Sequence, residues 1–202
     1  MSNGGRDETD PSSAEFFDRQ YAVADDPWNF ATSPYELGRY QAVLDHVDPT
    51  THRRVFEPGC SIGVLTEQLG RRCQLVHATD ISALAVQRAR ARCAHLPGVS
   101  IEVGTLAPSP GPPYDLVVVS EVGYYYPLPE LQHHIRTLAG RIRPAGRLIA
   151  VHWLGHSPDH VLHGDEVQRC ISEVLMEWRL IHHDVRWHSS GDGYRMDVWD
   201  RT

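Results

Sequence analysis

Short apolar segments alternate with amphipathic ones along most of the chain, and this order limits the fold more than any other feature. The clearest apolar segment is YDLVVVSEV at residues 114–122, an unbroken run typical of a strand buried on both faces. In the segment that follows, Leu131, Ile135 and Leu138 recur at spacings of four and three, which indicates an amphipathic helix. Strands that alternate with helices predict an α/β fold, a parallel sheet with helices on both faces.

The end of the chain departs from this alternation. Residues 179–187, RLIHHDVRW, and residues 194–201, YRMDVWDR, each alternate between apolar and polar side chains, and the turn sequence HSSGDG joins them. Two such segments with a short turn predict an antiparallel hairpin. No internal repeat or second domain is visible, so we expect the 202 residues to form a single domain.

The N-terminal region divides into a tail and a helical part. Residues 1–15, MSNGGRDETDPSSAE, are polar and lack the basic start and apolar stretch of a signal peptide. We therefore expect a disordered tail, a domain over residues 16–202 and a cytoplasmic protein. Within the domain, SPYELGRYQAVLDHV predicts a helix over residues 33–47, with Ser33 and Glu36 forming a capping box.

Composition narrows the classes of function. A net charge of −7 argues against a nucleic-acid-binding protein, and no apolar run reaches the ~20 residues that span a bilayer. All 19 basic residues are arginines, so no lysine can form a Schiff base or bind a phosphate.

The four cysteines lack C-x-x-C spacing, and Gly155 and Pro158 interrupt the histidine-rich segment 152–163. We therefore expect no metal site.

The segment VFEPGCSIGVLTEQL, residues 55–69, has the pattern of a strand, a glycine turn and the start of a helix. Gly59 and Gly63 allow a tight turn and a close approach of the backbone to a ligand. Asp80 ends the next predicted strand, near the offset of about 20 residues at which an acid binds a ribose. In an open parallel sheet, ligands bind beyond the carboxyl ends of the strands. These features together indicate an adenosine-containing ligand.

Two such ligands compete for the turn. NAD places a pyrophosphate at a G-x-G-x-x-G turn, whereas this chain has G-x-x-x-G, and Glu57 would repel the pyrophosphate. S-adenosylmethionine has no phosphate, and its sulfonium and ammonium groups suit a carboxylate at the strand end. Electrostatics therefore favours S-adenosylmethionine over NAD as the ligand, and this argues against an NAD-dependent oxidoreductase. A non-catalytic Rossmann-like binding protein is a third alternative, against which the intact Gly59, Gly63, Asp80 and Glu121 argue.

The same motifs carry a resemblance to a known family. EPGCSIG, TDIS, YDLVVVSEV and RPAGRLI resemble the class I S-adenosylmethionine-dependent methyltransferases over nearly all of the chain from Arg53 on. That family has a seven-stranded, mostly parallel Rossmann-like sheet, which the C-terminal hairpin fits. More narrowly, DDPWNFATSPYELGRY, GCSIGVLT, SEVGYYY and VHW followed by GD resemble the NodS family of rhizobial nodulation N-methyltransferases. That family methylates the free amine of a deacetylated chitooligosaccharide.

The resemblance implies roles for residues at the strand ends and near the N-terminus. The glycine turn would wrap the methionine part of the cofactor, the second strand end would hold the ribose, and residues 16–50 would form a lid. The implied cofactor-binding residues are Tyr21, Trp28, Tyr35, Glu57, Gly59, Cys60, Ser61, Gly63, Asp80, Ile81, Gly104, Thr105, Leu106, Ser120 and Glu121.

Methyl transfer to an amine needs a free nitrogen lone pair, and a carboxylate or imidazole can accept the proton or orient the nitrogen. Glu121 is the first candidate and His152 the second, although His152 suits a structural role equally well. The expected acceptor-binding residues are Tyr124, Tyr125, His152 and Trp153, because aromatic faces suit sugar rings and cations.

The acceptor is left open by the sequence. A sugar amine or chitooligosaccharide-like molecule is the leading expectation, and a small amine or hydroxyl of secondary metabolism comes next. The oligomeric state also stays undetermined, because the sequence carries no signal for it.

Overall fold

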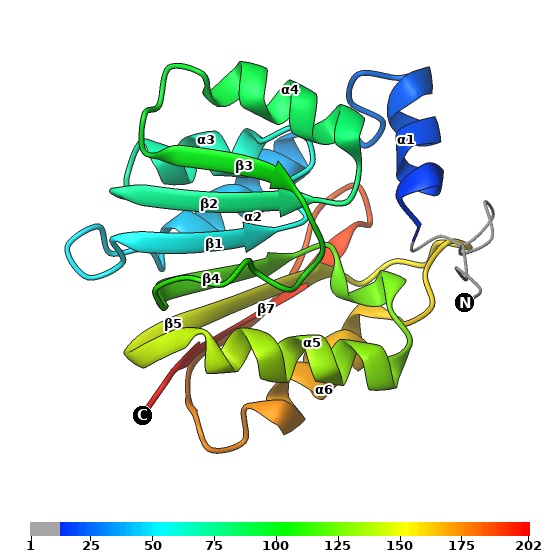
Figure 1. Ribbon diagram of the computed structural model, residues 1–202. Coiled ribbons are helices and arrows are strands. Elements are labelled where there is room, and N and C mark those ends of the chain that lie inside the picture. Colours follow the sequence, from blue (N-terminus) through cyan, green and yellow to red (C-terminus); the bar gives the residue numbers. More distant parts are fainter. Residues whose placement is uncertain (1–12) are drawn as a thin grey trace, which may run out of the picture.

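The computed structural model describes residues 13–202, and in this range one seven-stranded sheet has helices on both faces (Figure 1). The strand order is β3-β2-β1-β4-β5-β7-β6. β1 to β5 run parallel, and β7 runs antiparallel to both β5 and β6. The predicted fold class and its C-terminal antiparallel hairpin are therefore confirmed. The strands are β1 (Arg54–Pro58), β2 (Leu75–Asp80), β3 (Val99–Val103), β4 (Tyr114–Ser120), β5 (Ile142–Trp153), β6 (Arg179–Trp187) and β7 (Gly193–Asp200).

The helices cover the sheet in two groups. α5 and α6 pack on one face, and α2 and α3 pack on the other, with α4 over β2 and β3. α1 stands at the edge where the strands β1 to β4 end (Figure 1). The helices are α1 (Ala14–Val23), α2 (Pro34–Leu44), α3 (Val64–Gly70), α4 (Ala83–Cys93), α5 (Leu128–Gly140) and α6 (Gly164–Val174), with a short 3₁₀ helix, η1 (Gly123–Tyr125).

Strand β4 shows why an unbroken apolar run is needed at the centre of this sheet. Leu116 and Val118 belong to the core under α2 and α3, whereas Val117 and Val119 belong to the core under α5 and α6. All four are fully buried. Successive side chains of a strand point to opposite faces, so a strand with helices on both sides buries every residue.

The N-terminal region differs from the expectation in three details. α1 begins at Ala14, capped by the Ser13 hydroxyl, so helix starts within the predicted tail of residues 1–15. Residues 1–12 of that tail lie outside the described part of the chain. α2 has Ser33 as its N-cap, but the Glu36 side chain bonds to Arg39 instead of closing a capping box. α2 also ends at Leu44, before the predicted end at residue 47.

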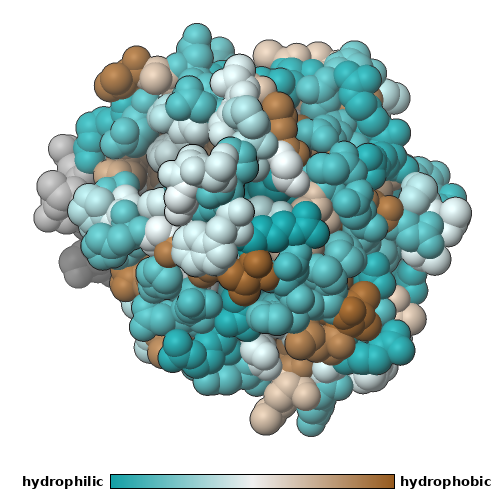
Figure 2. All heavy atoms as spheres, turned by 180° about the vertical axis from the view of Figure 1, so that it is seen from behind, coloured by the Kyte–Doolittle hydropathy of each residue, from teal (hydrophilic) through white to brown (hydrophobic). Residues whose placement is uncertain are grey.

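The surface of the described residues adds two observations. None of their helices is long and apolar enough to cross a membrane. The face in Figure 2 is mostly hydrophilic, and the hydrophobic residues exposed on it form small separate groups. Small groups of this kind are ordinary on a protein surface.

The order of the strands fixes where a ligand can bind. The chain proceeds from β1 outward to β2 and β3, and then crosses back to β4 on the other side of β1. The loops after β1 and β4 therefore leave the sheet on opposite sides. This divergence opens a crevice at the carboxyl ends of the two strands, the usual ligand site of such sheets.

Candidate active site

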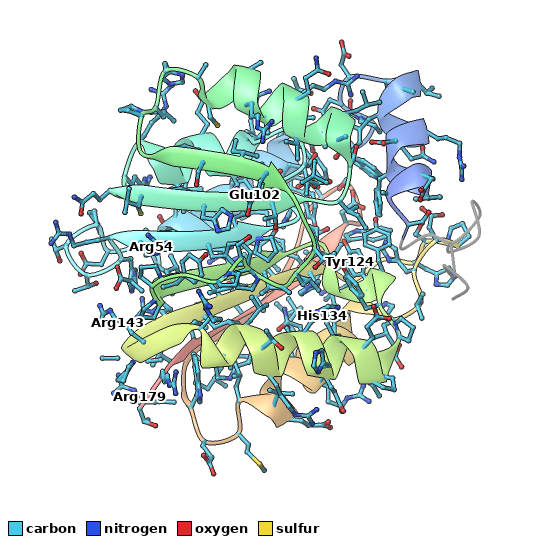
Figure 3. All side chains as sticks on the ribbon, in the orientation of Figure 1. Arg54, Glu102, Tyr124, His134, Arg143 and Arg179 are labelled. Atoms are coloured by element: carbon cyan, nitrogen blue, oxygen red, sulfur yellow. The ribbon has the colours of Figure 1, made fainter. Side chains whose placement is uncertain are left out.

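A cavity of about 420 Å³ lies at the carboxyl ends of the central strands. Its wall includes residues from the loops after β1, β2, β3, β4 and β5, from the region of α1 and α2, and from the turn before β7. Figure 3 places Tyr124 at this edge of the sheet and Arg54 and Arg143 at the opposite edge. The cavity is therefore where the strand order predicts a ligand.

The turn after β1 uses positive backbone angles at alternate residues. Gly59, Ser61 and Gly63 have φ values of 72°, 50° and 79°. A Cβ atom at Gly59 would stand 2.0 Å from Cγ1 of Val122, so this position has no room for a side chain. Ser61 shows that the middle residue of the turn needs no glycine, because its side chain has space and its hydroxyl bonds to the Tyr21 hydroxyl.

Asp80, at the end of β2, joins this turn to the next one. Its Oδ2 accepts the amide N–H of Ser61 at 2.8 Å, and its Oδ1 accepts that of Ser82 at 2.9 Å. Burial raises the pKa of Asp80 to about 6, although the two amides oppose this shift. The carboxylate lies in the cavity wall, where each oxygen keeps a lone pair for a ligand.

Glu57 was expected to be a charged carboxylate beside the ligand, but the structure buries it outside the cavity wall. Only 3% of it is exposed, it is not part of the cavity wall, and its Oε2 has no hydrogen-bond partner among the described residues. Burial raises its pKa to about 8, so the carboxyl is mostly neutral at pH 7 in the free protein. A mostly neutral Glu57 would repel a pyrophosphate only weakly, unlike the charged carboxylate expected from the sequence.

Glu121, directly after β4, lies in the cavity wall with a positive φ of 59°. Its Oε1 accepts the amide N–H of Trp153 at 2.8 Å, and its Oε2 accepts the Tyr124 hydroxyl at 2.7 Å. A non-glycine residue in this backbone region is uncommon and is often found at functional sites. The bonds to Trp153 and Tyr124 hold the carboxylate between the segment after β4 and the end of β5.

Arg39 lies behind this carboxylate and was missed by the sequence reasoning. Its side chain is 1% exposed, and one of its Nη atoms lies 3.7 Å from Oε1 of Glu121. The same guanidinium donates to the Ser120 hydroxyl at 2.6 Å and to the Glu36 carboxylate. Arg39 thereby connects α2 to the end of β4.

His152 is not in the cavity wall. It is fully buried, its Nε2 accepts the amide N–H of Gly123 at 3.2 Å, and its Nδ1 lies 3.3 Å from the amide nitrogen of Gln168. Burial lowers its pKa to about 3. A ring with both nitrogens occupied and no access to the cavity cannot reach an acceptor, so its position does not support the predicted catalytic and acceptor-binding roles.

Aromatic side chains form much of the remaining wall. Tyr124 stacks on His160 with ring centroids 3.8 Å apart, and Trp153 meets the same imidazole edge to face. From the N-terminal region, Trp28 packs against Tyr21 and Phe17. Arg88 of α4 donates to the backbone oxygen of Tyr21 at 2.8 Å and holds α1 over the cavity.

The structure brings most of the expected site residues together. In the wall are Tyr21, Trp28, Tyr35, Gly59, Ser61, Asp80, Ile81, Gly104, Thr105, Leu106, Glu121, Tyr124, Tyr125 and Trp153. Outside it are Glu57, Cys60, Gly63, Ser120 and His152. The sequence reasoning missed Phe17, Phe30, Ser33, Glu36, Val122, Tyr126, His156, Ser157, Asp159, His160 and Asp192. The loop after β5, residues 154–163, and the turn before β7 also lie at this edge, so strand direction could have indicated them.

The charged groups of the wall are almost all acidic. Among the described residues, the wall contains five carboxylates and two histidines, but no arginine. The carboxylates are Glu36, Asp80, Glu121, Asp159 and Asp192, and the histidines are His156 and His160. The cavity therefore favours a cationic ligand over an anionic one.

Comparisons with known proteins identify the family. A family model described as Nodulation protein S (NodS) matches residues 9–165, and Nodulation protein S of Rhizobium tropici is 30% identical over 77% of this chain and 68% of its own length. The chain belongs to the NodS family. It is accordingly a methyltransferase that uses S-adenosylmethionine.

Two further similarities complete the comparison of this NodS-family chain. A crystal structure of N-methyltransferase NodS from Bradyrhizobium japonicum, in complex with S-adenosylhomocysteine, has a TM-score of 0.82 at 21% identity, covering 94% of this chain and 98% of the other. A magnesium-protoporphyrin O-methyltransferase of Rhodobacter capsulatus is 31% identical over 64% of this chain and 66% of its own. Within residues 13–202, the NodS-family chain has no cluster of three or more His, Cys, Asp or Glu arranged to hold a metal ion.

We expect Glu57→Gln to raise the melting temperature of the free protein, and to raise it more at pH 8 than at pH 5. The folded-state pKa of about 8 lies above the usual 4.5, so the unfolded chain loses a proton that the folded chain keeps. Native stability therefore falls as the pH rises through this window, whereas glutamine has no proton to lose. Thermal unfolding at pH 5, 6.5 and 8 measures the effect.

The control for this experiment is Glu173→Gln, which changes an exposed acid on α6. It should shift the melting temperature equally little at all three pH values. A difference between Glu57→Gln and the wild type that does not grow with pH would contradict the raised pKa of Glu57.

Proposed function

We propose that this NodS-family methyltransferase methylates an amine nitrogen, and that its acceptor is a sugar amine of the chitooligosaccharide type. The observation that carries the proposal is the charge of the cavity wall, which has five carboxylates and no arginine among the described residues. An ammonium ion is attracted to such a wall, whereas an acceptor that carries a carboxylate or phosphate is repelled. A protonated amine is thus the acceptor that this wall would collect.

The residues present fit S-adenosylmethionine. Asp80 offers carboxylate oxygens to the ribose hydroxyls, and Ile81 and Leu106 give the adenine apolar neighbours. Near the glycine turn, the unpartnered Oε2 of Glu57 is a buried acceptor that an ammonium group can satisfy, directly or through a water. When bound, the cofactor supplies an electrophilic methyl group on a sulfonium.

Glu121 is proposed to hold the acceptor nitrogen. Tyr124 and the Trp153 amide fix the carboxylate, and each of its oxygens keeps a lone pair for an incoming ammonium. The rings of Tyr124, Tyr125 and Trp153 lie in the same wall and suit the faces of a sugar ring or a cation. Glu121 and these rings would align the nitrogen and exclude water, which is the main task of the protein in such a reaction.

The relatives bear on the choice between nitrogen and oxygen. The similar Bradyrhizobium protein is named an N-methyltransferase, and the similar Rhodobacter protein is named an O-methyltransferase. Both acceptor atoms thus occur among proteins that resemble this chain. The acidic wall favours nitrogen, because an amine is the acceptor that carries a positive charge at neutral pH.

A methyl-transfer screen with labelled cofactor tests this proposal. We expect label on glucosamine and its oligomers, because each carries a free amine that the acidic wall attracts. The matched control is the N-acetylated form of each oligomer, which has the same rings but no basic nitrogen. Label on carboxylates or hydroxyls and on no amine would contradict the proposal.

A second experiment tests the proposed role of Asp80. Asp80→Ala should weaken the binding of S-adenosylhomocysteine by roughly 10- to 100-fold, as expected for the loss of hydrogen bonds to a charged group. Calorimetric titration measures the affinity, and Asp184→Asn in the edge strand β6 is the control. A folded Asp80→Ala variant with unchanged affinity would refute the ribose-binding role.

A further inference from the structure

The loop between β5 and α6 places an imidazole in the cavity wall whose nitrogens are free. Neither ring nitrogen of His160 bonds to another described residue. His152 and His163 differ, because His152 has both nitrogens engaged and His163 uses its ring at the start of α6 and against the backbone oxygen of Leu154. His156 also lies in the wall with no hydrogen bond to its ring among the described residues, but it has none of the ring contacts that hold His160. His160 is therefore a base that faces the cavity and has no structural hydrogen bond to make.

The ring of His160 has a fixed orientation. It stacks on Tyr124 with an interplanar angle of 16° and meets Tyr125 edge to face at 5.2 Å. The backbone after it is held as well, since the amides of Val161 and Leu162 donate to the backbone oxygen of Tyr124 at 2.8 and 3.1 Å. A loop tied to η1 in this way presents the same edge of the imidazole to the cavity.

The position of His160 relative to Glu121 suggests a division of roles. Tyr124 stacks on His160, and its hydroxyl donates to Oε2 of Glu121, so one side chain separates the base from the carboxylate. Glu121 already accepts two hydrogen bonds and lies 3.7 Å from the guanidinium of Arg39, an arrangement that suits a carboxylate which holds a ligand in position. A separate neutral base is then needed for the proton.

We propose that His160 is the catalytic base, which removes a proton from the acceptor ammonium while Glu121 holds the nitrogen. This inference rests on the proposed amine acceptor. The ammonium gives one proton to a ring nitrogen of His160, and the electrons of that N–H bond stay on the acceptor nitrogen as its lone pair. The lone pair forms the bond to the methyl group, the C–S pair leaves on sulfur, and His160 later returns its proton to water. One proton is released for each methyl group transferred.

The surroundings of His160 keep it ready to accept a proton. Burial lowers its pKa below the usual 6.5, and Asp159 opposes this while His156 and His163 add to it. The other titratable neighbours are His152, whose pKa is lowered to about 3, and Tyr124 and Tyr125, whose pKa values burial raises. All three are neutral at pH 7, and His160 is mostly in its neutral form.

The test compares His160→Gln with the wild type in methyl transfer to a glucosamine oligomer and to benzylamine. Glutamine can hydrogen-bond but cannot accept a proton, so kcat at pH 7 should fall by about 100- to 10,000-fold. In the wild type, kcat should rise with pH through the pKa of His160, and the variant should lose this rise. Affinity for S-adenosylhomocysteine, measured by calorimetry, should stay within about twofold. His133→Gln, an exposed change on α5, is the control.

The outcomes separate this inference from the proposed function. An unchanged kcat, or a reduced kcat that keeps the wild-type pH profile, overturns the role of His160 and leaves the amine acceptor standing. Recovery of a His160→Ala variant by added imidazole supports the role. A wild-type protein that binds S-adenosylhomocysteine but methylates only oxygen acceptors overturns the amine acceptor, and the inference falls with it.

Discussion

Arg39 is a cation buried in the interior of the protein, and the arrangement of the site follows from the groups that compensate its charge. Its guanidinium contacts Glu36 in α2, the Ser120 hydroxyl at the end of β4 and, at 3.7 Å, the Glu121 carboxylate. A buried charge that loses one partner costs about 3–5 kcal/mol, so α2 is constrained to lie against the end of β4. The same contacts allow two carboxylates, Glu36 and Glu121, to stand in one cavity wall despite their mutual repulsion.

The acids and bases at this edge of the sheet divide according to their access to water. Glu57 and His152 point into the protein, and burial moves the pKa of each toward its neutral form. Asp159 and Asp192 face the cavity beside Glu121, where water and ligands reach them. The acidic groups of the cavity wall therefore come from the end of β2, where Asp80 lies, and from the segments around the strand ends. The buried Glu57 and His152 add no charge to this wall at neutral pH.

The fold and the outline of the site follow from local patterns in the sequence. The unbroken apolar run of β4 and the alternating hairpin predicted the sheet, and the rule for strand ends led to Gly59, Asp80 and Glu121. The alternation of side chains along a strand explains why two of the predicted site residues, Glu57 and His152, lie outside the cavity wall. His152 follows Leu148 and Ala150 on the face under α5 and α6, and Glu57 follows Val55 on the face under α2 and α3. Arg39 could not be found this way, because its contacts join segments that are far apart in the chain. Strand direction could have placed the loop that carries His160 at this edge, but not the stacking of His160 on Tyr124.

We infer that the wall around the reacting centre attracts positive charge. Calorimetric titration with two ligands that differ by one charge measures this attraction. The first is S-adenosylhomocysteine, and the second is the S-adenosylmethionine analogue in which an amine-bearing carbon replaces the methylated sulfur. Both lack a transferable methyl group, but only the analogue places an ammonium where the methyl group would stand. We expect the analogue to bind severalfold more tightly than S-adenosylhomocysteine at pH 7, and added salt to narrow the difference in affinity. Equal or weaker binding of the analogue would show that the wall does not attract positive charge.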